Sequence, residues 1–268
     1  MRITFIGGGN MASALIAGVL RQGHAAQHIA VVEHNAEARA RLLAAYPVRT
    51  YPGLCAEAVA ADVVVLAVKP QQLKALAQAL APLLASQLVV SIAAGVRART
   101  LSAWLQGYAS VVRTMPNTPA MIGAGVTALF ALPDVTAAQR QTAEAILQAA
   151  GSVLWVEDEA LMDAVTAVSG SGPAYVFYFI EAMQQAALEL GLSASAARQL
   201  ALQTMLGSAQ LAASSSEDVA TLRARVTSKA GTTERAVQCM DEAGVKAAIV
   251  SAIHAAAARS RELGDALQ

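Results

Sequence analysis

The feature that most constrains this sequence is a run of three glycines between a short apolar segment and a helical pattern. Residues 3–6 are apolar and partly β-branched, the glycines follow at once, and residues 11–20 have the pattern of a helix. With Ala12 as its last small residue, the turn reads G-x-G-x-x-A. Gly7 permits the tight turn, Gly9 lets the backbone approach a pyrophosphate, and the helix N-terminus faces the phosphates. The turn predicts a dinucleotide site; a purely structural glycine turn is the alternative.

The choice of dinucleotide depends on the residues that follow the second apolar run, 29–32. Glu33 stands where an acidic residue commonly binds the adenosine ribose hydroxyls and repels a 2′-phosphate, which favours NAD. His34, Asn35 and Arg39 come just after it and can together receive a phosphate. NADPH and NADH therefore both stay candidate cofactors. The candidate contacts in the turn and the helix start are Gly7, Gly8, Gly9, Asn10 and Met11.

Short β-branched runs alternate with helical patterns over the first part of the chain. The runs are residues 3–6, 29–32, 61–68, 87–92, 110–114, 125–131 and 152–156. Several are apolar without alternation, which suits strands of a parallel sheet that is covered on both faces. No strand signal recurs from about Leu161 onward. We predict an α/β fold with a doubly wound Rossmann-type parallel sheet in residues 1–160, followed by an all-helical dimerisation domain in residues 161–268.

One helical segment of the second part is apolar on all sides. Gly172-Pro173 places a proline at a first helical position, and Gly191 follows about 18 residues later, as helix ends favour. Residues 174–180 lack a polar face. Such a helix must be buried on every side, which in a small helical domain usually needs a partner chain. We therefore expect a homodimer; a central helix in a monomeric bundle is the alternative.

Charge and hydropathy limit the partners of the chain. It has 19 basic and 19 acidic residues, so nothing favours a nucleic acid or an anionic membrane, and a small molecule is the expected partner. No stretch of about 18 apolar residues is free of polar interruption, so we expect no membrane span. The N-terminal residues lack the pattern of a secretory signal, which predicts a cytoplasmic location.

Cysteine and histidine give no sign of a metal. Cys55 and Cys239 are far apart in sequence and fit no metal-ligand spacing, which favours reduced, buried thiols. The four histidines form no cluster with cysteine. We predict no metal site.

Four further segments combine residues that a plain loop does not need. Three are rich in turn residues: Val68-Lys69-Pro70, Met115-Pro116-Asn117-Thr118-Pro119 and Ser169-Gly170-Ser171-Gly172-Pro173. The first two follow strands at their carboxyl ends, where open α/β sheets bind ligands, although each alone can be an ordinary turn. The fourth, residues 227–234, brings hydroxyls and backbone N–H groups to a helix start, which favours a bound carboxylate or phosphate. The alternative is that Thr232 or Thr233 only caps the helix.

Taken in order, these segments resemble the blocks of the pyrroline-5-carboxylate reductase family. The blocks are FIGGGNMASALIAG, AVKP, VVSIAAGV, RTMPNTPA, VSGSGPAYVF with IEAM, and TSKAGTTERAV, and they span Phe5 to Val237. The resemblance implies hydride transfer from NADPH or NADH to the C=N bond of 1-pyrroline-5-carboxylate, giving L-proline in the last step of proline biosynthesis. It also implies a homodimer formed by the helical domain, while a larger ring of dimers stays open.

The resemblance also implies roles for individual residues. The loop from Ser228 to Thr233 would hold the substrate carboxylate through backbone N–H groups and the Ser228 hydroxyl, and the Thr233 hydroxyl would face the ring nitrogen. Within this loop, Gly231 and Thr232 are further candidate substrate contacts. The residues that would border the nicotinamide are Ala93, Met115, Pro116 and Asn117, and those near the ribose are Val68, Lys69 and Pro70.

Two departures from the family pattern bear on these roles. The family often reads Ser-Pro-Gly-Gly before the threonine pair, whereas this chain reads Ser228-Lys229-Ala230-Gly231. The N–H groups remain, so we expect a less rigid loop with the same role. At Glu33 the family often has small polar residues and uses NADPH, and this departure affects only the choice of cofactor.

The expected mechanism relies on positioning. We assign no histidine, cysteine or carboxylate of these blocks to proton transfer and predict no strong general acid. Thr233, the candidate catalytic residue, would orient the ring beside the nicotinamide rather than protonate it. A hydroxyacid dehydrogenase is the nearest enzyme alternative, but its catalytic lysine has no counterpart, because residues 174–227 contain no lysine. A dinucleotide-sensing binding protein is the alternative from another class.

Overall fold

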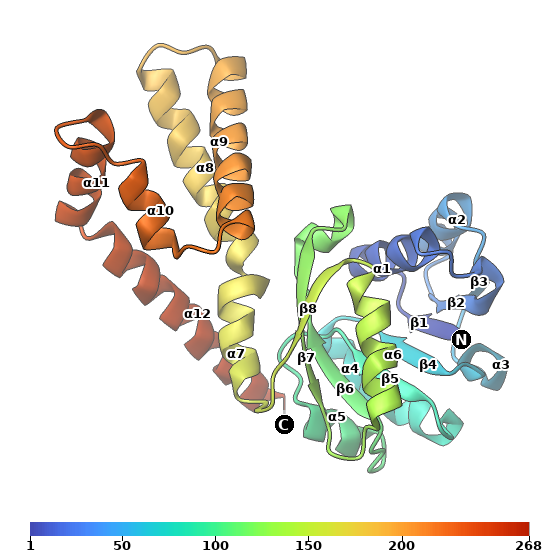
Figure 1. Cartoon of the computed structure of the whole chain (residues 1–268). Helices are drawn as coiled ribbons and strands as arrows, with labels where there is room; N and C mark the ends of the chain where they lie inside the picture. Colours follow the sequence, from blue (N-terminus) through green and yellow to red (C-terminus); the bar gives the residue numbers. More distant parts are fainter. Residues whose placement is uncertain (268) are drawn as a thin grey trace. The chain divides into compact units, whose positions relative to one another are not determined.

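The computed structural model describes residues 1–267, which form two compact units (Figure 1). The first unit comprises residues 1–171 together with the C-terminal segment from Ala256, and the second comprises Gly172–Ala255. The domains predicted from the sequence, 1–160 and 161–268, do not include this return of the C-terminal segment, and that division stays a prediction.

Polar contacts explain why the C-terminal segment belongs to the first unit. The Ser260 hydroxyl donates a hydrogen bond to Asp163 Oδ1 at 2.7 Å. Arg97 forms an ion pair with Asp265. Both contacts join residues that are far apart in sequence, so no local sequence pattern predicts them.

The first unit is built on an eight-stranded sheet with the order β3-β2-β1-β4-β5-β6-β7-β8. Its strands are β1 (Ile3–Ile6), β2 (Ile29–Val32), β3 (Arg49–Tyr51), β4 (Val63–Leu66), β5 (Leu88–Ser91), β6 (Val111–Met115), β7 (Gly125–Ala131) and β8 (Gly151–Trp155). The order 3-2-1-4-5-6 is that of a doubly wound Rossmann sheet. The predicted fold class is confirmed, and every residue of β1, β2, β4 and β5 is buried, as the uninterrupted apolar runs indicated.

Two features of the sheet differ from the prediction. Strand β3 was not predicted, because its sequence Arg-Thr-Tyr is short, half-exposed and without an apolar run. The sheet is also not wholly parallel, since β7 pairs with β6 in the antiparallel direction. Only residues 116–124 connect these two strands, and a parallel crossover needs a dozen or more residues. The short connection therefore reverses the chain direction.

Helices pack around this sheet (Figure 1). In the first unit they are α1 (Asn10–Arg21), α2 (Ala36–Ala45), α3 (Ala56–Val59), α4 (Pro70–Leu80), α5 (Ala98–Trp104), α6 (Ala137–Gln148) and α7 (Leu161–Val165). A π-helical turn, Thr166–Gly170, follows α7. Pro70 begins α4 at a position where its missing N–H costs nothing. The register of β1 with its neighbours matters most for function, because Ile6 lies opposite Val32 and Leu66, so three strands end at one edge.

The second unit is helical. Its helices are α8 (Gly172–Glu189), α9 (Ala194–Ser214), α10 (Val219–Arg225), α11 (Thr232–Glu242) and the first half of α12 (Val245–Ala266). From residue 161 to 267 the structure contains no strand, as predicted. Gly191, at φ +92°, follows the end of α8. The first turns of α8 expose Val176, Phe177 and Tyr178 by 44%, 61% and 76%. None of the helices in residues 1–267 is long and apolar enough to cross a membrane.

The prediction of buried thiols is wrong. Both cysteines are free and exposed. Cys55 precedes α3, where its Sγ accepts a hydrogen bond from the Ala58 N–H at 3.4 Å. Cys239 lies on α11, a helix without a buried residue in its own unit.

Candidate active site

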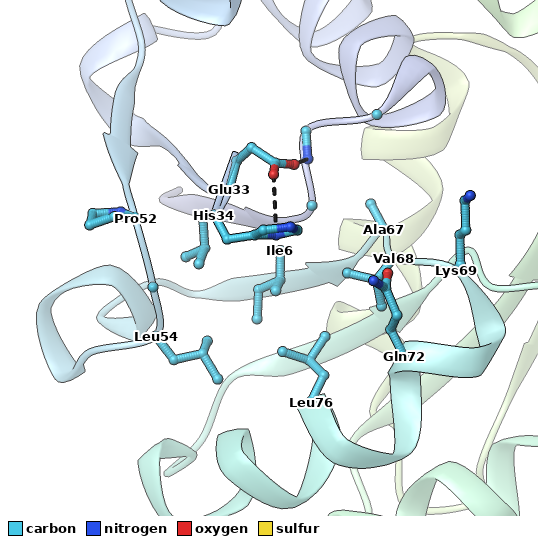
Figure 2. A pocket seen from close by; sticks show the side chains of 15 residues that line it. Ile6, Glu33, His34, Pro52, Leu54, Ala67, Val68, Lys69, Gln72 and Leu76 are labelled. Atoms are coloured by element: carbon cyan, nitrogen blue, oxygen red, sulfur yellow. Dashed lines mark hydrogen bonds and ion pairs between the residues drawn. The ribbon is translucent and has the colours of Figure 1, made fainter. Parts of the chain in front are cut away.

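A cavity of about 410 Å³ lies at the carboxyl ends of β1, β2 and β4, where the strand order of the sheet reverses direction (Figure 2). This is the place where open α/β sheets bind ligands. Its wall combines the glycine turn with residues that follow β2, β3 and β4. The lining residues are Ile6, Gly7, Gly8, Gly9, Val32, Glu33, His34, Pro52, Gly53, Leu54, Ala67, Val68, Lys69, Gln72 and Leu76.

The glycine turn has the shape that a dinucleotide phosphate needs. Gly7 has φ +100°, and a Cβ there would lie 2.5 Å from the Ala67 carbonyl oxygen. Gly9 precedes α1 in extended backbone, and no side chain caps this helix. A Cβ at Gly9 would meet no protein atom within 4 Å, so the space in front of the helix start is open. Free N–H groups at a helix N-terminus beside an open space fit a bound pyrophosphate.

Glu33 is fixed in the cavity by two backbone donors. Its Oε2 accepts a hydrogen bond from the Gly8 N–H and its Oε1 from the Asn35 N–H, each at 2.9 Å. The side chain is only 12% exposed. Burial raises the pKa of Glu33, but the hydrogen bonds from Asn35 and Gly8, with His34 and Arg39 nearby, outweigh it and lower the pKa below its ordinary value. The cavity therefore holds a fixed carboxylate anion at neutral pH.

Arg39 and His34 surround this carboxylate, but they are arranged differently. Arg39 Nη1 donates to the carbonyl oxygens of Glu33 and His34 at 2.7 and 2.9 Å. The His34 ring is exposed, with its Nδ1 at 3.4 Å from Glu33 Oε1. Asn35 caps α2 through its side chain, which accepts from the Ala38 N–H. Arg39 and Asn35, two of the three residues predicted to receive a phosphate, thus already form hydrogen bonds that shape the turn after β2.

The segment after β4 reaches the same cavity. Val68 and Lys69 line it, and Pro70 follows as the first residue of α4. Lys69 is exposed and precedes the helix without capping it by its side chain. The structure therefore brings the predicted ribose-side residues Val68 and Lys69 next to the glycine turn.

The predicted nicotinamide-side residues lie outside the lining of this cavity. Ala93 is buried just after β5, and Met115 ends β6. Asn117 joins two segments: its Oδ1 accepts from the Val126 N–H at 3.0 Å, and its Nδ2 donates to the Ser169 carbonyl at 3.1 Å. The segment 115–117 is therefore held against the π-helical turn, where a Cβ at Gly170 would overlap the Met115 side chain. Pro116, which lies between Met115 and Asn117 in the sequence, is buried.

In the second unit, residues 228–233 form a tight loop that leads into α11; we call it the 228–233 loop. The Gly231 N–H donates to the Ser228 carbonyl at 3.0 Å. A Cβ at Gly231 would lie 2.5 Å from the Ser228 hydroxyl oxygen, so glycine lets that hydroxyl approach the backbone. Gly231 is the residue that precedes the helix, and no side chain caps it. The alternative that Thr232 or Thr233 only caps α11 is therefore wrong.

Sequence reasoning missed one carboxylate in this loop region. Glu234 Oε2 accepts a hydrogen bond from the Ala230 N–H at 2.6 Å. Ala230 itself has φ +59°, in the left-handed region. A signal for this contact exists in the sequence, since a glutamate three residues after Gly231 matches the spacing of a capping box. Within residues 1–267, no group of three or more histidine, cysteine, aspartate or glutamate side chains is arranged to hold a metal.

Two family models match the chain. The model described as NADP oxidoreductase, coenzyme F420-dependent, matches residues 2–95, and the model described as pyrroline-5-carboxylate reductase dimerisation matches residues 159–263. The pyrroline-5-carboxylate reductase of Pseudomonas aeruginosa is 50% identical over 268 residues, which cover 99% of this chain and 98% of that protein. The one of Haemophilus influenzae is 42% identical, with 97% of each chain covered.

Solved structures agree with these relatives. The pyrroline-5-carboxylate reductase of Coxiella burnetii has a TM-score of 0.92 and 41% identity, with 98% of each chain covered. The pyrroline carboxylate reductase of Plasmodium falciparum, solved with NADP bound, has a TM-score of 0.88 and 27% identity over 98% of each chain. The chain belongs to the pyrroline-5-carboxylate reductase family.

Proposed function

We propose that the chain reduces 1-pyrroline-5-carboxylate to L-proline with NADH or NADPH, as the last step of proline biosynthesis. The observation that carries this proposal is the uncapped start of α11 behind the 228–233 loop. Helix geometry leaves the first N–H groups of α11 without an intrahelical partner, and such a terminus binds a carboxylate. The family whose members match this chain over nearly its whole length is named for a substrate that carries one.

In this proposal the 228–233 loop binds the substrate carboxylate. The N–H groups of Thr232 and Thr233 at the helix start, with the Ser228 hydroxyl, supply the donors. Gly231 keeps the hydroxyl close to the backbone, since a side chain at this position would collide with it. The Thr233 hydroxyl, one residue into the helix, contacts the ring nitrogen.

The glycine turn and Glu33 hold the adenosine end of the cofactor. Gly7, Gly8, Gly9, Asn10 and Met11 present the helix start to the pyrophosphate, and Glu33 accepts the ribose hydroxyls beside His34 and Asn35. The carboxylate of Glu33 is 12% exposed and held in place by two N–H groups. A fixed anion repels a 2′-phosphate, so this end of the cavity favours NADH over NADPH.

The segments after β4, β5 and β6 carry the reactive end of the cofactor. Their carboxyl ends lie at the edge of the sheet where ligands bind in this fold. Val68, Lys69 and Pro70 are placed toward the ribose, and Ala93, Met115, Pro116 and Asn117 border the nicotinamide. Asn117 contributes rigidity, because its amide is already bonded to Val126 and Ser169.

Catalysis in this proposal is mainly positioning. When bound, NAD(P)H supplies the hydride that adds to the imine carbon. The chain holds the substrate by its carboxylate and orients the ring through Thr233, which fixes the imine carbon for attack. Placing two reactive groups about 3–3.5 Å apart accounts for a large part of the rate of an intrinsically reactive pair. No side chain of the site is assigned as a strong acid, and the protonated imine is taken up from solution.

We further propose that the chain acts as a cytoplasmic homodimer whose helical domain forms the interface. Val176, Phe177 and Tyr178 on α8 are exposed by 44%, 61% and 76%, which is unusual for large apolar and aromatic side chains in one stretch. This helix lies within the match to the dimerisation model. Light scattering should give the mass of a dimer or of a ring of dimers, and a monomer would contradict the proposal.

The function is tested by following the loss of reduced nicotinamide absorbance with 1-pyrroline-5-carboxylate as substrate. We expect turnover with NADH and NADPH, and Thr233→Ala should lower kcat/KM about tenfold or more, because a hydrogen bond to the ring is lost. Thr142→Ala is the matched control, since that half-buried hydroxyl on α6 donates to the Ala138 carbonyl of its own helix at 2.9 Å. Absence of turnover with both cofactors would support the binding-protein alternative.

A further inference from the structure

The start of α11 contains a carboxylate that the proposed reaction does not use. Glu234 is the third residue of the helix, and its Oε2 accepts a hydrogen bond from the Ala230 N–H at 2.6 Å. The side chain therefore folds back over the first helical turn onto the 228–233 loop. Capping-box glutamates reach back in the same way to the residue that precedes the helix. Here the carboxylate reaches one residue further, into the loop itself.

The donor of this bond, Ala230, has a backbone conformation that alanine resists. Ala230 has φ +59°, where a Cβ is crowded by the following carbonyl. Such a residue keeps this backbone only when its surroundings impose it. The Gly231 N–H fixes the other side of the turn through the Ser228 carbonyl at 3.0 Å. Glu234 supplies the acceptor for the N–H of Ala230 on this side of the turn.

The same carboxylate also affects the charge of the loop. A negative side chain in the first turn interacts favourably with the helix dipole. It competes, however, with any second anion at the same helix end, and the proposed substrate is an anion. Glu234 therefore has two opposing effects: its hydrogen bond shapes the loop, and its charge weakens the attraction for a carboxylate.

We infer that Glu234 is a positioning residue for the substrate carboxylate, which shapes the 228–233 loop through Ala230 and limits the affinity for the anionic substrate by its own charge. The inference rests on the proposed function, because it assumes that this loop binds the carboxylate of 1-pyrroline-5-carboxylate. It concerns KM for this substrate and leaves the cofactor cavity unaffected.

Two substitutions separate the two effects. Glu234→Gln keeps a carbonyl oxygen for the Ala230 N–H and removes the charge, so KM for 1-pyrroline-5-carboxylate should fall about two- to fivefold. Glu234→Ala removes both, so the shape of the loop is lost and KM should rise about fivefold or more. Neither should change KM for NADH. Glu242→Gln and Glu242→Ala, at the far end of the same helix, are the matched controls. Their KM for 1-pyrroline-5-carboxylate should equal that of the unaltered chain.

A double substitution tests the link through Ala230. Glycine adopts positive φ without help, so in an Ala230→Gly background the loop should keep its shape without Glu234. Adding Glu234→Ala there should leave KM unchanged or lower it. A carboxylate with a merely structural role in α11 would give the same penalty in both backgrounds, which would overturn the inference.

Amide hydrogen exchange provides a readout that does not depend on activity. Peptides that cover residues 228–234 should exchange faster in Glu234→Ala than in the unaltered chain. In Glu234→Gln they should exchange at the same rate as in the unaltered chain. Unchanged exchange in Glu234→Ala, or equal KM values for the alanine and glutamine variants, would contradict the inference while the proposed function stands. If the unaltered chain turns over no substrate with NADH or NADPH, the proposed function fails, and the inference fails with it.

Discussion

Two loops of this chain lead from a turn into a helix N-terminus, and each places a glutamate on a loop N–H group. In the glycine turn, the Gly8 N–H donates to Glu33 at 2.9 Å; in the 228–233 loop, the Ala230 N–H donates to Glu234 at 2.6 Å. Each also contains one residue with positive φ, Gly7 at +100° and Ala230 at +59°. In the proposed function both loops have the same task, which is to present free N–H groups to an anion.

The supports of the two loops differ. Glu33 directly follows β2, is 12% exposed, and is 25 positions away from its Gly8 partner. Glu234 is exposed and only four positions away from Ala230. The sheet core thus determines the shape of the glycine turn, whereas local contacts determine the shape of the 228–233 loop. We expect the first to respond to steric changes at glycine and the second to single changes of backbone preference or charge.

The largest effects are expected from the two glycines that flank the turn. Gly7→Ala puts a Cβ 2.5 Å from the Ala67 carbonyl at φ +100°, and strain of this kind costs about 1–3 kcal/mol before the clash is counted. Gly9→Ala meets no protein atom within 4 Å and keeps extended backbone. It should therefore leave the melting temperature unchanged and raise Kd for NADH about tenfold or more, because the methyl group occupies the pyrophosphate space.

Thermal unfolding and a fluorescence titration with NADH check both glycine variants. An equal loss of stability in Gly9→Ala and Gly7→Ala would contradict this distinction between the two glycines, because the space in front of α1 would then be filled by protein. An unchanged Kd for NADH in Gly9→Ala would also contradict the prediction, because the pyrophosphate would then lie elsewhere.

A smaller effect is expected from the charge of Glu33. Glu33→Ser removes the fixed anion at the ribose end, so the ratio of kcat/KM with NADPH to kcat/KM with NADH should rise about tenfold, equivalent to about 1.4 kcal/mol. Glu37→Ser is the control, since Glu37 is exposed on α2 and its side chain lies 3.9 Å from Arg41. Steady-state rates with both cofactors give the ratio. An unchanged ratio would show that Glu33 only braces Gly8 and Asn35.

The sequence was sufficient to predict the buried strands of the sheet and the glycine turn because their signals are local and repeated. Short apolar runs marked the buried strands, and the doubly wound topology brings their carboxyl ends together. Glu33, Val68 and Lys69 could thus be placed beside Gly7 from their positions after strands. These residues line one cavity with Gly7, and their roles toward the cofactor stay predictions.

The parts that could not be predicted depend on contacts between distant residues or on weak local preferences. The Glu159 carboxylate accepts from Arg113 and from the Ala98 N–H, 46 and 61 positions away, and no pattern in the sequence links them. Strand β3 is defined by its pairing with β2 rather than by its composition. The left-handed backbone of Ala230 was missed for another reason, since alanine ordinarily avoids it.

The smallest effect is expected from Ala230→Gly, which tests whether the 228–233 loop is held together only by local contacts. The left-handed backbone costs alanine about 1–2 kcal/mol, and glycine avoids this cost but loses about 0.5–1 kcal/mol through the greater freedom of the unfolded chain. The variant should therefore be more stable by about 0.5–1 kcal/mol, seen as a higher midpoint of urea unfolding with an unchanged slope. Ala236→Gly, in the regular part of α11, should lose about 1 kcal/mol. A gain of stability in Ala230→Gly with a loss in Ala236→Gly would show that the backbone of Ala230 is strained and that Glu234 holds it in place. A loss of stability in both variants would mean that the loop needs no such support. The 228–233 loop would then resemble the glycine turn more closely than its contacts indicate.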